Sequence, residues 1–214
     1  MLTGATGNTG EKVLAGLRGA FPEVPVLALA RPESATSALE ARGTEVWKGD
    51  LTSASALAGV FRPGDVLVET ANLRLARAAL PVFERAGGRR AFCVTTTAVF
   101  STFQKFRELY EQVEAEMKSS PVEVTILRPS MIYGNERDHN MHRLLRLLDR
   151  APAIPVFGGS ALMQPVHVED LAAGIVQAVR ADARGAFNLA GPTALPYLNV
   201  LREAAGALGR RVAM

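Results

Sequence analysis

Three glycines near the start of the chain, Gly4, Gly7 and Gly10, have the spacing of turns that bind a dinucleotide pyrophosphate. Glycine permits a tight turn and lets backbone N–H groups approach phosphate oxygens without a Cβ in the way. The segment that follows, EKVLAGLRG, has a helical pattern, so its positive end would point at the same phosphates. We therefore predict a cofactor-binding loop formed by Gly4, Thr6, Gly7, Asn8, Thr9 and Gly10.

The residue at the end of the next predicted strand indicates which nicotinamide dinucleotide is bound. An acidic residue there would accept hydrogen bonds from the adenosine ribose hydroxyls, whereas an arginine suits a 2′-phosphate. The predicted strand VPVLALA at 24–30 is followed by Arg31. The sequence therefore favours NADP over NAD as the cofactor. The alternative interpretation is that Arg31 is an exposed charge at a strand end.

Short apolar runs alternate with helical patterns along the first two thirds of the chain. The predicted strands cover 24–30, 44–50, 65–71, 90–97 and 122–129, with helical segments between them. Units of this length are typical of βαβ crossovers, which require a parallel sheet with helices on both faces. We therefore expect an α/β fold, a Rossmann-like doubly wound parallel sheet.

The pattern changes after Pro129. A loop-like segment, a short helix around 142–150 and a stretch rich in proline and glycine come first, and an amphipathic helix, a short strand and a last helix follow. We predict a single NAD(P)-binding domain over residues 1–214. In it, residues 133–165 and 190–214 contribute most of a small C-terminal cap for the substrate over the strand ends.

The overall composition excludes several classes of protein. The 214 residues are 48% hydrophobic and 21% charged, which is typical of a soluble globular protein. The net charge of +3 is mild and the arginines are scattered, so we predict no nucleic-acid partner. The single cysteine, Cys93, lies in an apolar run, which predicts a packed thiol in a reducing compartment. Without a signal peptide or a bilayer-length apolar run, we expect a cytoplasmic protein with no membrane partner, and we predict no metal site.

Four stretches together resemble a known superfamily: GATGNTG, the GDL at 49–51, ILRPSMIYG at 126–134 and QPVHVEDLA at 164–172. They occur in the expected order and cover nearly the whole chain. The chain is similar to extended or atypical members of the short-chain dehydrogenase/reductase superfamily. The group it resembles is usually described as NAD-dependent epimerases/dehydratases, which include nucleoside-diphosphate-sugar epimerases.

This resemblance assigns further residues to the cofactor. Asp50 and Leu51 would lie against the adenine, and Ala71 would border a cofactor ribose. Pro129 and Ile132 would approach the nicotinamide carboxamide. These positions supplement the glycine loop and follow from the resemblance alone.

The superfamily's catalytic residues are a hydroxyl residue, a tyrosine and a lysine four positions after it, which lowers the pKa of the phenol. Thr96 matches the hydroxyl position, where it would orient the substrate oxygen. The dyad is missing, because one alignment places Glu108 and Gln112 at the two positions. In the other, Tyr110 is followed by Glu114, whose negative charge would raise the pKa of a phenol. We therefore predict a packing or surface role for Tyr110.

Other polar residues follow the strand predicted at 122–129. Tyr133 is a phenol near the expected nicotinamide position. The proton donor or acceptor would then be Tyr133, water or a group of the substrate. Arg137 and His139 lie in the loop NERDHN, where they would bind a polar or phosphorylated small molecule, such as a nucleotide sugar. The same charged residues would also be at home in any exposed turn.

Two hypotheses about function follow from these residues. The first is an NAD(P)-dependent oxidoreductase or nucleotide-sugar epimerase-like enzyme that acts on a carbonyl or carbinol substrate. The alternative is a catalytically silent NADP(H) sensor or partner-binding module, which the missing dyad favours. The first strand holds only Met1 to Thr3 and the cap is shorter than is usual in the superfamily. We therefore expect a monomer with an open site or a homodimer that completes it.

Overall fold

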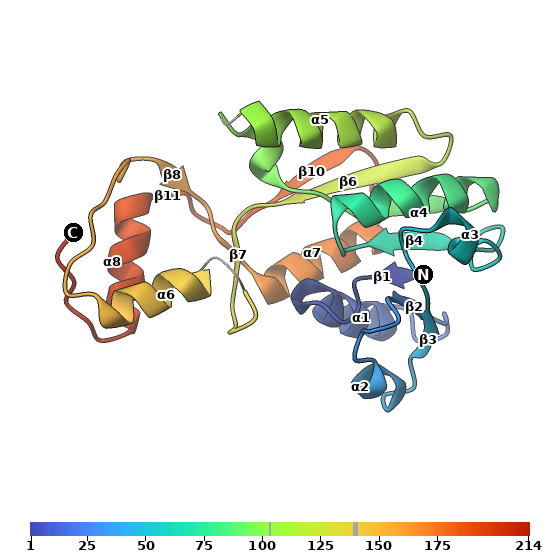
Figure 1. The fold of residues 1–214 in the computed structure, drawn as a ribbon, viewed down its shortest axis with the longest axis horizontal. Coiled ribbons are helices and arrows are strands. Elements are labelled where there is room, and N and C mark those ends of the chain that lie inside the picture. The colour runs from blue at the N-terminus through green and yellow to red at the C-terminus, as the bar shows by residue number, and fades with distance from the viewer. Residues whose placement is uncertain (103, 139–140) are drawn as a thin grey trace.

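The computed structural model describes residues 1–102, 104–138 and 141–214. Within them, seven strands form one parallel sheet in the order β10-β6-β5-β4-β1-β2-β3 (Figure 1). The strands are β1 (Leu2–Thr3), β2 (Leu27–Ala30), β3 (Glu45–Lys48), β4 (Val66–Glu69), β5 (Arg90–Val94), β6 (Glu123–Pro129) and β10 (Ala186–Leu189). The predicted Rossmann-like, doubly wound α/β fold is confirmed.

The short strand β1 lies at the centre of this sheet. Leu2 pairs with Ala28 of β2 on one side and with Val68 of β4 on the other, and its side chain is fully buried. The strand order reverses between β1 and β4. In open α/β sheets the crevice beyond such a reversal, at the carboxyl ends of the strands, is where ligands bind.

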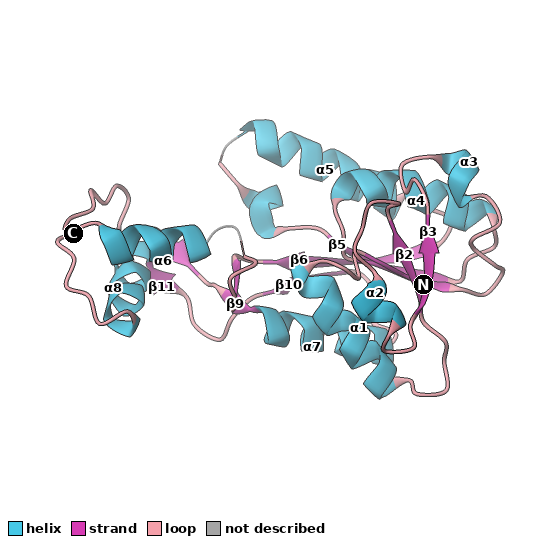
Figure 2. Ribbon diagram, turned by 60° about the horizontal axis from the view of Figure 1, so that its bottom comes forward, coloured by secondary structure: helices cyan, strands magenta, loops and turns pink. Residues whose placement is uncertain are grey.

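Helices cover both faces of the sheet (Figures 1 and 2). On one face lie α1 (Asn8–Ala20) and α7 (Val168–Arg180), and on the other lie α4 (Leu73–Arg85) and α5 (Gln104–Lys118). Successive strand residues point to opposite faces, so Leu67 packs with the α4 and α5 side and Val68 with the α1 and α7 side. This two-sided burial explains why the strands read as continuous apolar runs.

Several strands end earlier than the sequence indicates. Strand β4 ends at Glu69 and β5 ends at Val94, whereas we predicted that they extend to residues 71 and 97. After β5, the amide of Ala98 donates to Thr96 Oγ1 at 3.2 Å, which caps the short 3₁₀ helix η1 (Thr97–Phe100). After β4, the amides of Ala71 and Asn72 likewise donate to Glu69 Oε1, so the chain turns away from the sheet at both strand ends.

Smaller elements complete the sheet's connections. The short helices α2 (Ser37–Glu40) and α3 (Ala54–Leu57) follow β2 and β3. Beyond the carboxyl end of β6, β7 (Ile132–Tyr133) pairs in parallel with β9 (Val166–His167), which leads directly into α7. No helix in the described part of the chain is both long enough and apolar enough to cross a bilayer.

A group of C-terminal elements lies at one end of the molecule, at the left of Figure 1. It contains α6 (Met141–Arg150), α8 (Tyr197–Ala207) and the antiparallel pair β8 (Leu162–Met163) and β11 (Leu195–Pro196). It has a small core of its own around Leu148, Leu201 and Ala205. These elements belong to the two ranges predicted to form the cap, and their role in substrate binding stays a prediction.

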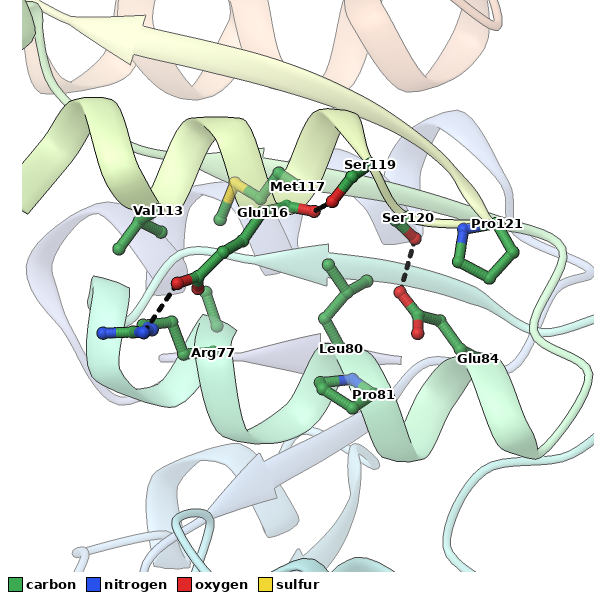
Figure 3. Close-up of a pocket in the computed structure, with 11 residues that line it drawn as sticks. Arg77, Leu80, Pro81, Glu84, Val113, Glu116, Met117, Ser119, Ser120 and Pro121 are labelled. Carbon is green, nitrogen blue, oxygen red and sulfur yellow. Dashed lines mark hydrogen bonds and ion pairs between the residues drawn. The ribbon is translucent and has the colours of Figure 1, made fainter.

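A hollow of about 310 Å³ lies between α4 and α5 (Figure 3). Leu80, Pro81 and Met117 give it an apolar wall. The side chains of Arg77 and Glu116 form an ion pair of 2.6 Å across it. Both partners are more than 40% exposed, so this ion pair contributes little to stability.

Candidate functional site

A cleft of about 970 Å³ opens at the carboxyl ends of the central strands. The glycine loop, the ends of β2, β4, β5 and β6, and α5 all contribute to its wall. The predicted residues that line it are Gly4, Thr6, Gly7, Asn8, Thr9, Gly10, Arg31, Leu51, Ala71, Thr96, Pro129, Ile132 and Arg137. The fold thus brings together segments more than 100 residues apart in the chain.

The geometry of the glycine loop fits a bound phosphate. Gly4 has a φ of +73°, and its carbonyl accepts a hydrogen bond of 2.8 Å from the amide of Gly7. A Cβ on Gly10 would lie 2.0 Å from the Gly4 oxygen, so the helix can start this close to the turn only with glycine there. Helix α1 begins at Asn8 after Gly7, which has no side chain to cap the first amides. These amides therefore face the cleft without a side-chain acceptor from the N-cap.

The charged residues of the cleft wall are of one sign. Arg31, Arg74 and Arg137 line it, and none of the described lining residues carries a carboxylate. Arg31 Nε lies 3.3 Å from Glu33 Oε1, but both side chains are more than 60% exposed and the pair is easily broken. Such a wall favours an anionic ligand.

Three predicted site residues are not among the described lining residues of this cleft, and their roles stay predictions. The carboxylate of Asp50 instead accepts from the hydroxyl and amide of Thr52 at 2.7 and 2.8 Å, and these bonds lower its pKa. Tyr133 packs edge-on against His167, with ring centroids 5.3 Å apart, and is not among the described lining residues. His139 lies outside the described residues.

Sequence reasoning missed Tyr110. It gave this residue a packing or surface role, but the structure places Tyr110 and its neighbour Leu109 in the cleft wall that also contains Thr96. Other lining residues that it missed lie mostly in the turn after β4 and at strand ends; they are Leu29, Ala30, Ser34, Thr70, Asn72, Leu73, Arg74, Leu75, Val94 and Thr95. The available signal was that this turn directly follows a predicted strand, because the carboxyl ends of parallel strands are where ligands bind.

The carboxylate of Glu114 is paired, which changes the sequence-based assessment of Tyr110. Arg128 donates to both of its oxygens, from Nε at 2.7 Å and from Nη2 at 2.5 Å. Thr95 Oγ1 donates a third hydrogen bond of 3.0 Å. The bond to Glu114 raises the pKa of Arg128, so the guanidinium stays charged and offsets the negative charge that we expected Glu114 to direct at Tyr110.

A buried carboxyl group, Glu69, supports the turn that forms one side of the cleft. Its Oε1 accepts from Thr3 Oγ1 at 3.1 Å and from the amides of Ala71 and Asn72 at 2.8 and 3.2 Å. Its Oε2 is buried without a hydrogen-bond partner among the described residues. Burial raises the pKa of Glu69 from 4.5 to about 7, against the hydrogen bonds, which lower it. Burial and then the adjacent Glu69 also raise the pKa of Cys93, which therefore remains a thiol.

Substitution of Glu69 by glutamine is expected to remove a pH dependence of stability. Between about pH 4.5 and 7 the folded protein keeps a proton on Glu69 that the unfolded chain has released. The free energy of unfolding should then fall by about 1 kcal/mol per pH unit as the pH rises through this range. Glu69→Gln keeps an oxygen acceptor for the amides but does not titrate, so its urea midpoints should lack this slope.

The matched control is Glu45→Gln, which makes the same chemical change on an exposed residue of β3. This variant should keep the slope of the original protein. Equal slopes in the original protein and in Glu69→Gln would show that Glu69 is ionised in the folded state throughout this range.

Comparison with known proteins gives a family and several structural relatives. The model of the NAD(P)H-binding family matches residues 4–182. A ceramide reductase from Caulobacter vibrioides is 26% identical, with 98% of this chain and 70% of the reductase aligned. Citrobacter triphenylmethane reductase complexed with NADP(H) superimposes with a TM-score of 0.81 at 19% identity, covering 99% of this chain and 76% of that one.

Two further solved structures have the same fold. An NADPH-dependent quinone oxidoreductase from Escherichia coli has a TM-score of 0.79 at 20% identity, with 99% of this chain and 75% of that chain covered. A double mutant of a dTDP-glucose 4,6-dehydratase from Streptomyces venezuelae, bound to NAD, has a TM-score of 0.78 at 19% identity, with 100% and 84% covered. The predicted likeness to epimerases/dehydratases is confirmed at the level of the fold. Because the family model spans the glycine loop and most of the sheet, the chain belongs to the NAD(P)H-binding family of Rossmann-fold proteins.

Proposed function

We propose that this protein is an NAD(P)H-dependent reductase of a small carbonyl compound. The observation that supports this most is that one cleft contains the glycine loop, cationic residues and two hydroxyl side chains, Thr96 and Tyr110. The bound reduced dinucleotide supplies the hydride. In the reaction the carbonyl carbon gains that hydride and the oxygen gains a proton, so the products are an alcohol and NAD(P)⁺.

The protein's own residues would orient the substrate and donate the proton. Thr96 Oγ1 accepts from the amide of Ala98, which leaves the hydroxyl proton to be donated to a substrate oxygen. Tyr110 is the second possible proton donor, and whichever hydroxyl gives up its proton regains one from water. Neither role requires the lysine of the superfamily's usual dyad.

We propose NADPH as the preferred form of the cofactor. Arg31 and Ser34 line the cleft after β2, where a 2′-phosphate on the adenosine ribose would lie. The ion pair between Arg31 and Glu33 is exposed, so little free energy is lost when the guanidinium moves from Glu33 to a phosphate. NADPH should therefore bind more tightly than NADH.

The test is to measure binding and turnover separately. Titration with NADPH and NADH gives the two Kd values. Turnover is followed as the loss of absorbance of the reduced nicotinamide in the presence of a panel of carbonyl compounds and nucleotide sugars. Tyr110→Phe and Thr96→Val should each lower kcat by about 100-fold while the Kd for NADPH stays within about twofold. Tyr133→Phe decides between the two phenols. If kcat falls further in Tyr133→Phe than in Tyr110→Phe, the proton donor is Tyr133 and not Tyr110.

The second candidate function is a silent NADP(H) sensor. It is favoured by the ion pair of Glu114 with Arg128, which occupies the position where the alternative alignment would require a lysine after Tyr110. This function predicts NADPH binding without turnover of any compound in the panel. If neither NADPH nor NADH binds, both proposed functions are wrong.

A further inference from the structure

The segment 134–138, here called the strap, leaves β7 and lies across the glycine loop. Its side chains contact that loop and the first turn of α1. Asn135 Nδ2 donates to Asn8 Oδ1 at 2.6 Å. Arg137 donates to the carbonyl of Thr6 at 2.6 Å and to Glu11 Oε2 at 2.9 Å. We expected Arg137 to bind the substrate, which stays a prediction; its side chain contacts the glycine loop and α1.

The strap is held at both of its ends. Gly134 has a φ of +136°, and a Cβ there would lie 2.6 Å from Nε2 of His167, so glycine is required for this close approach. Asn135 Oδ1 accepts from the amide of Arg137 at 2.9 Å, which fixes the turn between them. At the other end, Asp138 Oδ1 accepts from the amide of His142 at the start of α6. The backbone therefore directs Arg137 toward the glycine loop.

The charge of Arg137 is only partly balanced by the described protein groups that surround it. The guanidinium lies beside the amino end of α1, where the helix dipole is positive and disfavours a cation. Glu11 offsets part of this charge, but Glu11 also pairs with Arg42 at 3.5 Å. The side chains of Arg137 and Glu11 are 51% and 39% exposed, so their ion pair is weak. An anion in the cleft would be attracted by both the helix end and the guanidinium.

We propose that Arg137 is a ligand of the cofactor pyrophosphate and that the strap clasps the bound dinucleotide against the glycine loop. This inference rests on the proposed NAD(P)H binding and concerns the affinity for the cofactor, separate from recognition of the carbonyl substrate. Arg137 lines the same cleft as Gly7 and Thr9. A guanidinium can bind two phosphate oxygens side by side, whereas the amides of the glycine loop carry only partial charges.

The test compares the binding of two probes to variants of the full chain. Arg137→Met should raise the Kd for NADPH by about 10- to 100-fold, as expected for the loss of a charge-assisted pair. It should raise the Kd for 2′-phospho-ADP-ribose, which has the pyrophosphate but no nicotinamide, by a similar factor. Arg137→Lys retains the charge without the planar fork, so its affinity should be intermediate.

The matched control is Arg42→Met, which removes a cation from the same Glu11 carboxylate at a position that is not among the described lining residues of the cleft. Its Kd for NADPH should stay within about twofold of the value for the original protein. Its thermal midpoint should be close to that of Arg137→Met, since both changes remove an exposed cation. Unchanged binding of NADPH by Arg137→Met would overturn the inference. So would a loss seen with NADPH but not with 2′-phospho-ADP-ribose, since that would place Arg137 at the nicotinamide end. Failure of the original protein to bind NADPH would instead overturn the proposed function.

Discussion

Replacement of Gly10 by alanine is expected to abolish dinucleotide binding. The new Cβ would lie 2.0 Å from the oxygen and 2.6 Å from the carbonyl carbon of Gly4, and 2.9 Å from Thr70 Oγ1. Two of these atoms belong to the backbone, so the start of α1 must move away from the turn. The amides that would bind the phosphates move with it. We expect the Kd for NADPH to rise by more than about 100-fold, because several charge-assisted hydrogen bonds are lost together.

Gly19→Ala is a matched control on the same helix. A Cβ at Gly19 meets no described atom within 4 Å, and alanine is favoured over glycine inside a helix by about 1 kcal/mol. This variant should bind NADPH normally and unfold at a slightly higher temperature. If Gly10→Ala bound NADPH within about threefold of the original protein, the glycine loop would not be the phosphate-binding element.

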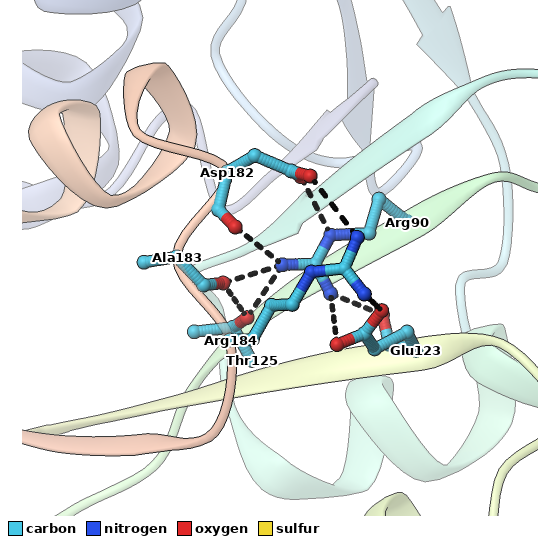
Figure 4. A network of polar contacts seen from close by, with 6 residues as sticks. All are labelled: Arg90, Glu123, Thr125, Asp182, Ala183 and Arg184. Carbon is cyan, nitrogen blue, oxygen red and sulfur yellow. Dashed lines mark hydrogen bonds and ion pairs between the residues drawn. The ribbon is translucent and has the colours of Figure 1, made fainter.

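Replacement of Arg90 by methionine is expected to give the largest loss of stability. The side chain of Arg90 is only 4% exposed and lies between β5, β6 and the segment after α7 (Figure 4). It donates to Asp182 Oδ1 at 2.9 Å, to Thr125 Oγ1 at 3.0 Å and to the carbonyl of Glu123 at 3.1 Å, and it also donates to the carbonyl of Ala183. Methionine fills a similar volume but leaves these acceptors without their donor. The side chains of Asp182 and Glu123 are 48% and 41% exposed and their carboxylates can be solvated by water, so the cost comes mainly from the buried acceptors and should be about 1–3 kcal/mol.

Arg184→Met provides the comparison for this variant. Arg184 pairs with the carboxylates of Glu123 and Asp182, which also lie within 3.7 and 2.9 Å of Arg90, but the side chain of Arg184 is 64% exposed. Its loss should therefore cost less than about 1 kcal/mol. Urea unfolding of both variants measures the difference. Arg90 also lowers the pKa of Asp182 through their hydrogen bond, so that pKa should rise in Arg90→Met and stay low in Arg184→Met. Equal stabilities of the two variants would mean that the buried network contributes nothing.

The fold could be predicted well because its signals are local. The inner strands of the sheet are apolar runs buried on both faces, whereas the edge strands β3 and β10 are more exposed. The longer helices each have an amphipathic period, so neighbouring residues contain most of the information. The strand ends were less accurate. At Glu69 and Thr96 the side-chain oxygens bind backbone amides of the following turns and end the strands, and an apolar pattern does not show such bonds.

The site was predictable only in part. The glycine loop and Arg31 follow from motif spacing, and the structure places all of them in the cleft wall. Asp50 was assigned to the adenine by resemblance; its carboxylate accepts a hydrogen bond from Thr52, and its role toward the adenine stays a prediction. Tyr110 was set aside because Glu114 is one helical turn from it. That inference omitted Arg128, which lies on another strand and pairs with Glu114.

The amino-acid order was sufficient to specify the glycine loop, the alternation of strands and helices and the family, since each depends on residues that are close in the chain. The folded structure alone decided which distant side chains share a cleft. It brought Arg137 to Thr6 and Glu11, more than 120 residues away, and placed Tyr110 in the same wall as Thr96. The physical reason is that charges and hydrogen bonds act over a few ångströms in space, and separation along the chain does not determine that distance.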